Sequence, residues 1–218
     1  MASRESSRVM IHAAMDIGNV LVHSDFNSFL KQLSKSLNIT IEEATYFMNR
    51  TQKLHDLGCT KMADELRDHF HIRSPVVIDE IIASWNDIIK PNYYLLQRLS
   101  DMMATKDLQI ALLSNIGLEH AVTTGQALNV GGFFDKCIKH FSCYVGARKP
   151  TVIYYQSFLQ LHPEWQGCVY VDDLQENLDA SKQFGFRPFR FALDEATTQQ
   201  EKSFAAKVDE LEQIISGL

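Results

Sequence analysis

The stretch VMIHAAMDIGNVLV, residues 9–22, decides how this chain folds. A mostly apolar run ends at Asp16, and apolar residues resume after a glycine and an asparagine. Apolar runs of this length between turn residues are typical of buried strands. A carboxylate at the end of such a strand is costly to desolvate unless a cation meets it. We therefore predict that Asp16 lies at the mouth of a parallel sheet and has partners at other strand ends.

Length, charge and cysteine usage argue against several classes of protein. A length of 218 residues suits one large domain or a core domain with an insert. The formal net charge of −6 argues against nucleic acid as a partner, because no basic stripe is present to neutralise phosphates. The polar N-terminus and the lack of a long apolar run predict no signal peptide and no membrane partner. Four scattered cysteines fit reduced thiols, so we expect a cytoplasmic protein.

Residues 26–90 have helical rather than strand character. Phe29, Leu30, Leu33 and Leu37 recur near helical spacing, and Thr40 is placed to cap a second helix. Residues 76–89 form a further amphipathic pattern before a proline. We predict an all-helical cap domain at 26–90, inserted into a core domain of residues 1–25 and 91–218. We interpret the large apolar side chains of this region as helix-packing residues, among them Phe47, Met48, Met62 and Trp85.

After residue 93 helices and strands alternate. The apolar patterns predict helices at 94–103, 118–128, 151–161, 178–184 and 201–215. They predict strands at 108–113, near 139–141 and at 167–171, and residues 185–191 lead to a last strand. Alternation of this kind predicts an α/β fold with a doubly wound, Rossmann-like parallel sheet. The helical insert would then cover the active edge of that sheet.

Polar side chains follow two more of these strands, and a lysine precedes a helix between them. Ser114 and Asn115 follow the strand at 108–113, Lys149 precedes the helix at 151–161, and Asp172 and Asp173 follow the strand at 167–171. In a doubly wound sheet such positions can converge on Asp16. Carboxylates supply the hard oxygen ligands that Mg²⁺ prefers, and a lysine can meet both Asp16 and an anionic substrate.

Four motifs in this order resemble those of the haloacid dehalogenase superfamily. They are DIGNV at 16–20, LSN at 113–115, RKP at 148–150 and VDD at 171–173 with Asn177 downstream, and the resemblance covers nearly the whole chain. The helical insert between the first two motifs looks like the C1-type cap of subfamily I. The first motif is similar to that of bacterial α-glucose-1-phosphatase-like enzymes and is near the N-terminal phosphatase domain of soluble epoxide hydrolases.

The resemblance implies a role for each of these residues. Asp16 would be the nucleophile that forms an aspartyl-phosphate. Mg²⁺ would be bound by Asp16, the carbonyl of Gly18 and Asp172, with Asp173 and Asn177 in support. Ser114 and the backbone of Asn115 would bind phosphoryl oxygens, and Lys149 would neutralise charge in the transition state. The implied activity is a Mg²⁺-dependent phosphatase acting on a small phosphorylated metabolite, for example a sugar phosphate.

The first motif departs from the usual phosphatase pattern at one position. Most phosphatases of the superfamily carry a second Asp two residues after the nucleophile, where this chain has Gly18. That carboxyl protonates the leaving alcohol and later activates water. Other sources of the proton would be His55 or Asp56 in the cap, His23 or Asp25 after the first motif, or water. A substrate with a good leaving group would depend less on such an acid.

Each motif taken alone also fits a purely structural role. Ser114 and Asn115 can terminate a strand, Lys149 can be a solvated loop charge, and Asp172 or Asp173 can cap a helix. Two other functions also remain open, a non-catalytic binding or regulatory protein that retains the fold and, less favoured, a haloacid dehalogenase. The paired carboxylates at 172 and 173 speak against the dehalogenase. The substrate and the oligomeric state are not specified by the sequence.

Overall fold

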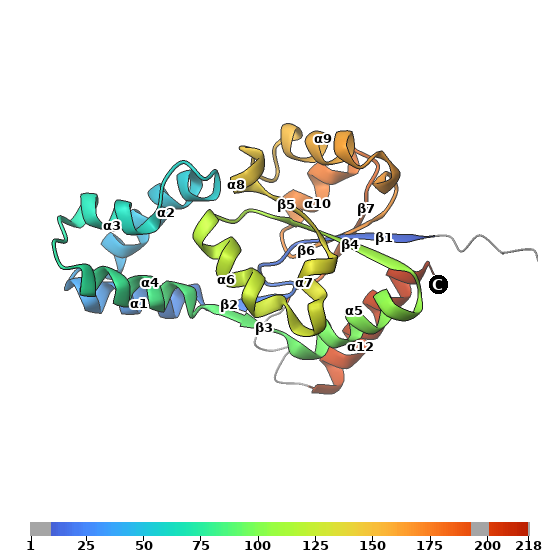
Figure 1. Ribbon diagram of the computed structural model, residues 1–218, viewed down its shortest axis with the longest axis horizontal. Coiled ribbons are helices and arrows are strands. Elements are labelled where there is room, and N and C mark those ends of the chain that lie inside the picture. Colours follow the sequence, from blue (N-terminus) through green and yellow to red (C-terminus); the bar gives the residue numbers. More distant parts are fainter. Residues whose placement is uncertain (1–9, 193–200, 218) are drawn as a thin grey trace, which may run out of the picture.

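A computed structural model describes residues 10–192 and 201–217, with a five-stranded sheet between two layers of helices (Figure 1). Its strands are β1 (Ile11–Met15), β4 (Leu108–Ser114), β5 (Ile138–Phe141), β6 (Val169–Asp172) and β7 (Arg187–Arg190). The order in the sheet is β5-β4-β1-β6-β7, and every pairing is parallel. The strand order reverses at β1, which confirms the predicted doubly wound fold. The polar N-terminal segment expected to carry no signal peptide lies outside the described residues.

The two faces of the sheet are covered by different helices because side chains alternate along each strand. Ala13 and Met15 of β1 face a core formed with α5 (Tyr93–Thr105), α6 (Leu118–Leu128) and α12 (Glu201–Ser216). Ala14 faces the opposite core, which is formed with α9 (Val152–Leu161) and α10 (Gln175–Lys182). Burial on both faces explains why residues 11–15 form a nearly continuous apolar run.

The remaining helices and turns are short and connect these layers. They are η1 (Val130–Gly132), α7 (Phe133–Lys136), α8 (Ser142–Val145) and η2 (Pro163–Trp165). Helix α10 starts earlier than the predicted bound of 178, because the turn after β6 leads directly into it. None of the helices in the described part of the chain is long and apolar enough to cross a membrane.

Four helices extend to one side of the sheet (Figure 1). They are α1 (Phe26–Leu37), α2 (Ile41–Asp56), α3 (Met62–Phe70) and α4 (Pro75–Asn86), and their apolar faces form a hydrophobic cluster of their own. The Thr40 hydroxyl accepts a hydrogen bond from the Glu43 amide at 3.1 Å, and the Glu43 carboxylate accepts one from the Thr40 amide at 2.8 Å. This capping box starts α2 where the sequence indicated. The division into a core and a cap domain remains a prediction.

One detail of the insert differs from the prediction. The helix expected at 76–89 ends at Asn86, and β3 (Ile89–Pro91) pairs antiparallel with β2 (Val22–Ser24). The region expected to be free of strands therefore ends in a two-stranded ribbon that joins the insert to the sheet. Local periodicity missed this ribbon, because it depends on pairing between segments more than sixty residues apart in the chain.

Candidate functional site

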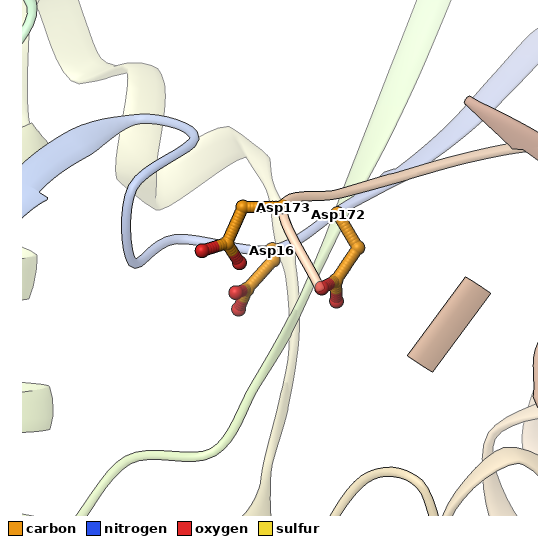
Figure 2. Close-up of side chains that lie close together, drawn as sticks. All are labelled: Asp16, Asp172 and Asp173. Carbon is orange, nitrogen blue, oxygen red and sulfur yellow. The ribbon is translucent and has the colours of Figure 1, made fainter. Parts of the chain in front are cut away.

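Three carboxylates meet at the reversal point of the sheet (Figure 2). Asp16 follows β1, Asp172 ends β6 and Asp173 comes directly after it. One oxygen from each of the three lies within 4.8 Å of the others. Asp16 is held in this position by its backbone amide, which donates a hydrogen bond to the carbonyl of Val171 at 2.8 Å. The strands therefore bring together the acidic residues that the sequence placed at their ends.

Lys149 lies between two of these carboxylates. Its Nζ is 2.9 Å from Oδ1 of Asp16 and 2.7 Å from Oδ2 of Asp172, and only 3% of the residue is exposed. Burial alone would lower the pKa of Lys149, but the two ion pairs outweigh it and raise that pKa. The ammonium is therefore charged and fixed between the two strand ends.

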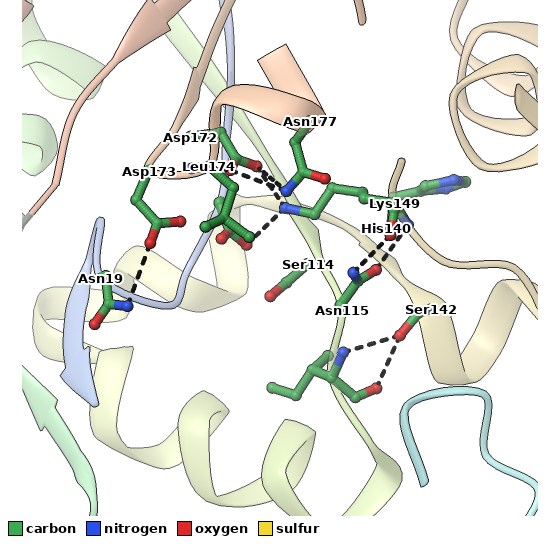
Figure 3. A network of polar contacts seen from close by, with 12 residues as sticks. Asn19, Ser114, Asn115, His140, Ser142, Lys149, Asp172, Asp173, Leu174 and Asn177 are labelled. Carbon is green, nitrogen blue, oxygen red and sulfur yellow. Dashed lines mark hydrogen bonds and ion pairs between the residues drawn. The ribbon is translucent and has the colours of Figure 1, made fainter. Parts of the chain in front are cut away.

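Asp172 is held rigidly by its neighbours (Figure 3). The Asn177 amide donates to both carboxylate oxygens at 3.0 and 3.1 Å, and the Leu174 amide donates to Oδ1 at 2.9 Å. The Tyr170 hydroxyl donates a further hydrogen bond to Oδ2. Burial would raise the pKa of Asp172, yet Lys149 and these donors lower it. Asn177, the first-turn residue of α10, thus lies where the sequence placed it, in support of Asp172.

Asp173 has a different partner. The Asn19 side-chain amide donates to Oδ2 of Asp173 at 3.3 Å, while its own oxygen accepts from the amide of Ser24 at 3.4 Å. Asn19 adopts a left-handed backbone conformation with φ of 53°, which asparagine tolerates better than most residues. Burial raises the pKa of Asp173 in spite of this hydrogen bond. The first motif therefore positions both Asp16 and, through Asn19, Asp173.

The charge balance of the site fits a divalent cation. Three carboxylates share one ammonium, so negative charge remains in excess. The pKa of Asp16 is raised to about 6, by burial first and by Asp172 and Asp173, although Lys149 lowers it. A bound cation would relieve this repulsion, and clustered carboxylate oxygens are the donors that Mg²⁺ prefers. Asp16, Asp172 and Asp173 thus fit the ion that the sequence implied.

Ser114 ends the neighbouring strand β4, and Asn115 directly follows it. Asn115 bonds twice to the backbone of Lys149: its amide donates to the carbonyl at 2.9 Å, and its oxygen accepts from the backbone N–H at 2.8 Å. The side chain of Asn115 therefore positions the backbone of the lysine. Ser114 is 4% exposed. Both residues line the cavity that adjoins the site.

This cavity has a volume of about 270 Å³ and lies between the sheet edge and the helical insert. Gly18, Ser114 and Asn115 line it on the sheet side. The insert contributes Met48 and Trp85, which also belong to the hydrophobic cluster of α1–α4. The interpretation of Met48 and Trp85 as helix-packing residues was therefore incomplete, because both also face this cavity. A Cβ added to Gly18 would meet no atom within 4 Å.

The residues suggested as replacements for the missing acid lie in different places. Asp56 lines the cavity, but its Oδ2 accepts hydrogen bonds from Nη2 and Nε of Arg148 at 2.8 and 3.0 Å. His55 is 1% exposed and does not line the cavity, and its Nε2 lies 3.0 Å from Oε2 of Glu119. His23 and Asp25 are also absent from the lining, and Asp25 caps α1 by accepting from an amide at 3.0 Å.

Gln52 of α2 and His120 of α6 also line the cavity, and neither was among the predicted site residues. The centroids of the His120 and Trp85 rings are 3.9 Å apart, and Nε2 of His120 is 3.2 Å from the carbonyl oxygen of Trp85. Burial first, and then the charge of His55, lower the pKa of His120 to about 4. Gln52 lies one helical turn before Asp56, so the two side chains share a face of α2. Once Asp56 is known to line the cavity, this spacing indicates that Gln52 does so too.

No family model and no curated protein matches the sequence. Solved structures do match. The HAD family enzyme BT-2542 from Bacteroides thetaiotaomicron has a TM-score of 0.73 and 18% identity over 87% of this chain and 98% of that one. A predicted HAD-like hydrolase from Porphyromonas gingivalis has a TM-score of 0.66 and 15% identity over 90% and 98%. The L-2-haloacid dehalogenase of Xanthobacter autotrophicus has a TM-score of 0.59 and 15% identity over 88% and 82%. The chain therefore has the HAD-like fold expected from its motifs.

Proposed function

We propose that this protein is a Mg²⁺-dependent phosphatase that hydrolyses a small phosphorylated metabolite through an aspartyl-phosphate. The observation that carries the proposal is the group of three carboxylates within 4.8 Å around a buried lysine at the reversal point of the sheet. An excess of negative charge at such a point suits a cation and a phosphoryl group together. Structures of BT-2542 that hold magnesium and inorganic phosphate support this choice.

Asp16 is the nucleophile in this proposal. Its carboxylate attacks phosphorus, an acyl-phosphate bond forms, and the bond from phosphorus to the leaving oxygen breaks. Water then attacks the phosphorus, releases inorganic phosphate and restores the carboxylate. Lys149 balances the charge of Asp16 and of the phosphoryl oxygens during both steps. Ser114 and the backbone amide of Asn115 bind and orient those oxygens, at the edge of the cavity that both residues line.

Asp16, Asp172 and Asp173 would hold Mg²⁺, with the carbonyl of Gly18 as a further ligand. The ion would supply charge stabilisation for the phosphoryl oxygens. Asn177 keeps Asp172 oriented through its two hydrogen bonds, and Asn19 does the same for Asp173. Since Gly18 supplies no proton, the leaving oxygen takes its proton from water.

The test is release of inorganic phosphate from a panel of sugar, nucleotide, aryl and acyl phosphates, with Mg²⁺ and with a chelator. We expect turnover of at least one member, dependent on Mg²⁺ and lost in Asp16→Asn. Beryllofluoride, which mimics a phosphoryl group on a carboxylate, should bind the wild type with Mg²⁺ and not the variant.

The same panel and a halide-release assay separate the other two functions. Beryllofluoride or phosphate binding without turnover of any member would favour a non-catalytic binding protein. Halide release from short 2-haloacids in the presence of chelator would favour a dehalogenase, the activity of one neighbour in fold. An Asp16→Asn variant as active as the wild type would rule out the proposed nucleophile.

A further inference from the structure

The cavity beside the carboxylates has a distinctive charge pattern. Ser114 and Asn115 line it, so a phosphoryl group bound at the strand ends would extend its leaving group into this space. None of the described residues that line the cavity is a lysine or an arginine. The nearby Arg148 forms an ion pair with Asp56, which is 4% exposed. A second anionic group on the substrate would therefore find no free cation here.

The ring pair on the cavity wall adds to this effect. His120 stays neutral at pH 7, because burial lowers its pKa to about 4. Its ring packs on Trp85 with centroids 3.9 Å apart, and both residues line the cavity. Ile88 and Ile116 add apolar surface. An uncharged group with an apolar face can bury against this wall, whereas an ionised group would lose its hydration without a partner.

The size of the cavity gives a second limit. Its volume of about 270 Å³ is slightly below the usual range of ligand pockets, which begins at roughly 300 Å³. A single ring or a short chain fits such a space. Burial of most of a small leaving group would contribute to binding in proportion to the apolar area removed from water.

We propose that the substrates are phosphate monoesters whose leaving group is compact, carries no charge of its own and presents an apolar face to Trp85. This inference rests on the proposed phosphatase function and specifies its substrate class. It excludes bisphosphates and phosphorylated acids, whose leaving groups carry a charge of their own. It also assigns the selection to the cavity wall contributed by the insert and α6, and not to the carboxylates.

Three aryl phosphates whose leaving groups depart with nearly equal ease test whether a charge on the leaving group lowers turnover. They are phenyl phosphate, 3-carbamoylphenyl phosphate and 3-carboxyphenyl phosphate, of which the last two have the same shape and differ in charge. We expect kcat/KM for the carboxylate to be lower than for the carbamoyl compound by about tenfold or more. Equal or faster turnover of the carboxylate would overturn the inference and leave the phosphatase function intact.

A positive charge placed in the cavity should weaken the preference for the uncharged compound. Gln52 is exposed, lines the cavity and lies on α2, so Gln52→Lys is expected to fold normally. It should raise the carboxylate-to-carbamoyl ratio of kcat/KM several-fold. Asn49→Lys is the matched control, because Asn49 is exposed on the same helix and does not line the cavity. An equal change of the ratio in both variants would overturn the role of the cavity.

Binding tests the inference independently of turnover. Calorimetric titration of Asp16→Asn with the three compounds in Mg²⁺ should give weaker binding of the carboxylate than of the carbamoyl compound. If no phosphate ester is hydrolysed but this order of binding holds, the phosphatase proposal fails and the ligand preference stands. If the carboxylate binds as tightly as the carbamoyl compound, the inference fails whatever the activity.

Discussion

The strand-end site and the cavity beside it are organised in opposite ways. At the strand ends, Lys149 and Asp172 are fixed by ion pairs and by several donors, and both are almost fully buried. In the cavity, Gly18 leaves open space, and the walls are contributed by helices distant in the sequence. The charge geometry is therefore built into the sheet, whereas in the proposed phosphatase the proton supply and the substrate selectivity would depend on the surrounding cavity.

Of the variants that test this contrast, substitution of Lys149 should cause the largest loss of stability and of activity. Lys149→Met removes the cation between Asp16 and Asp172, and breaking a buried pair costs about 3–5 kcal/mol of unfolding free energy. We expect phosphatase activity to fall on the order of a thousandfold, because the charge of the transition state is no longer balanced. Urea unfolding and phosphate release at saturating Mg²⁺ measure the two effects.

Lys182→Met is the matched control for this variant. Lys182 forms an ion pair with Asp179 at 2.7 Å, the same length as the pair between Lys149 and Asp172, but both side chains are more than half exposed. Exposed pairs are worth about 0–1 kcal/mol, so the control should be nearly as stable as the wild type. Equal losses in the two variants would show that burial of Lys149 does not matter.

The next largest effect should come from filling the open space at Gly18. Gly18→Asp adds a carboxyl at the cavity wall, where the new Cβ would have no atom within 4 Å. A proton donor there should raise kcat for alkyl phosphates, which leave poorly, by about a hundredfold. Aryl phosphates should gain little, because their leaving groups need less protonation.

Gly18→Asn distinguishes the effect of an acidic proton from the effect of a larger side chain at this position. It has nearly the same size as the aspartate variant but no acidic proton, so it should not raise kcat. If both variants gain equally on alkyl phosphates, the effect comes from packing or binding and the missing-acid interpretation is wrong.

The same contrast explains what the sequence could predict. The positions of Asp16 and Asp172 could be predicted because each comes at the end of an apolar run, and parallel strand ends meet at one edge of a sheet. The ring pair of Trp85 and His120 could not be found in this way. It brings α4 against α6 across 35 positions of the chain, and neither helix has a local pattern that indicates the other.

Gly117→Ala should have a smaller effect, confined to the interface between insert and sheet. A Cβ on Gly117 would lie 1.9 Å from Cε1 of His55, although its φ of −80° suits any residue. The ring would have to move away from Glu119, at a cost of about 1–3 kcal/mol for overpacking. Two kcal/mol is roughly a thirtyfold change in the unfolding constant, which urea titration resolves.

Gly18→Ala gives the comparison for that variant. Its Cβ enters open space, so the free energy of unfolding should stay within about 0.5 kcal/mol of the wild type. If Gly117→Ala is as stable as Gly18→Ala, the His55 ring is not held as tightly as its contacts with Glu119 and Trp85 indicate.

The smallest effect concerns pH and Mg²⁺ affinity. The pKa of Asp16 is raised to about 6 by burial, so below this pH the metal-free protein holds a proton that Mg²⁺ must displace. The affinity for Mg²⁺ should therefore fall by about tenfold from pH 7 to pH 5, while above pH 7 it should be nearly constant. Titration calorimetry in buffers of different ionisation enthalpy should detect nearly one proton released per ion at pH 5. In Asp16→Asn this release should be smaller, because only Asp173 keeps a raised pKa among the proposed ligands. If the variant releases as many protons as the wild type, the group that titrates is Asp173 and not Asp16.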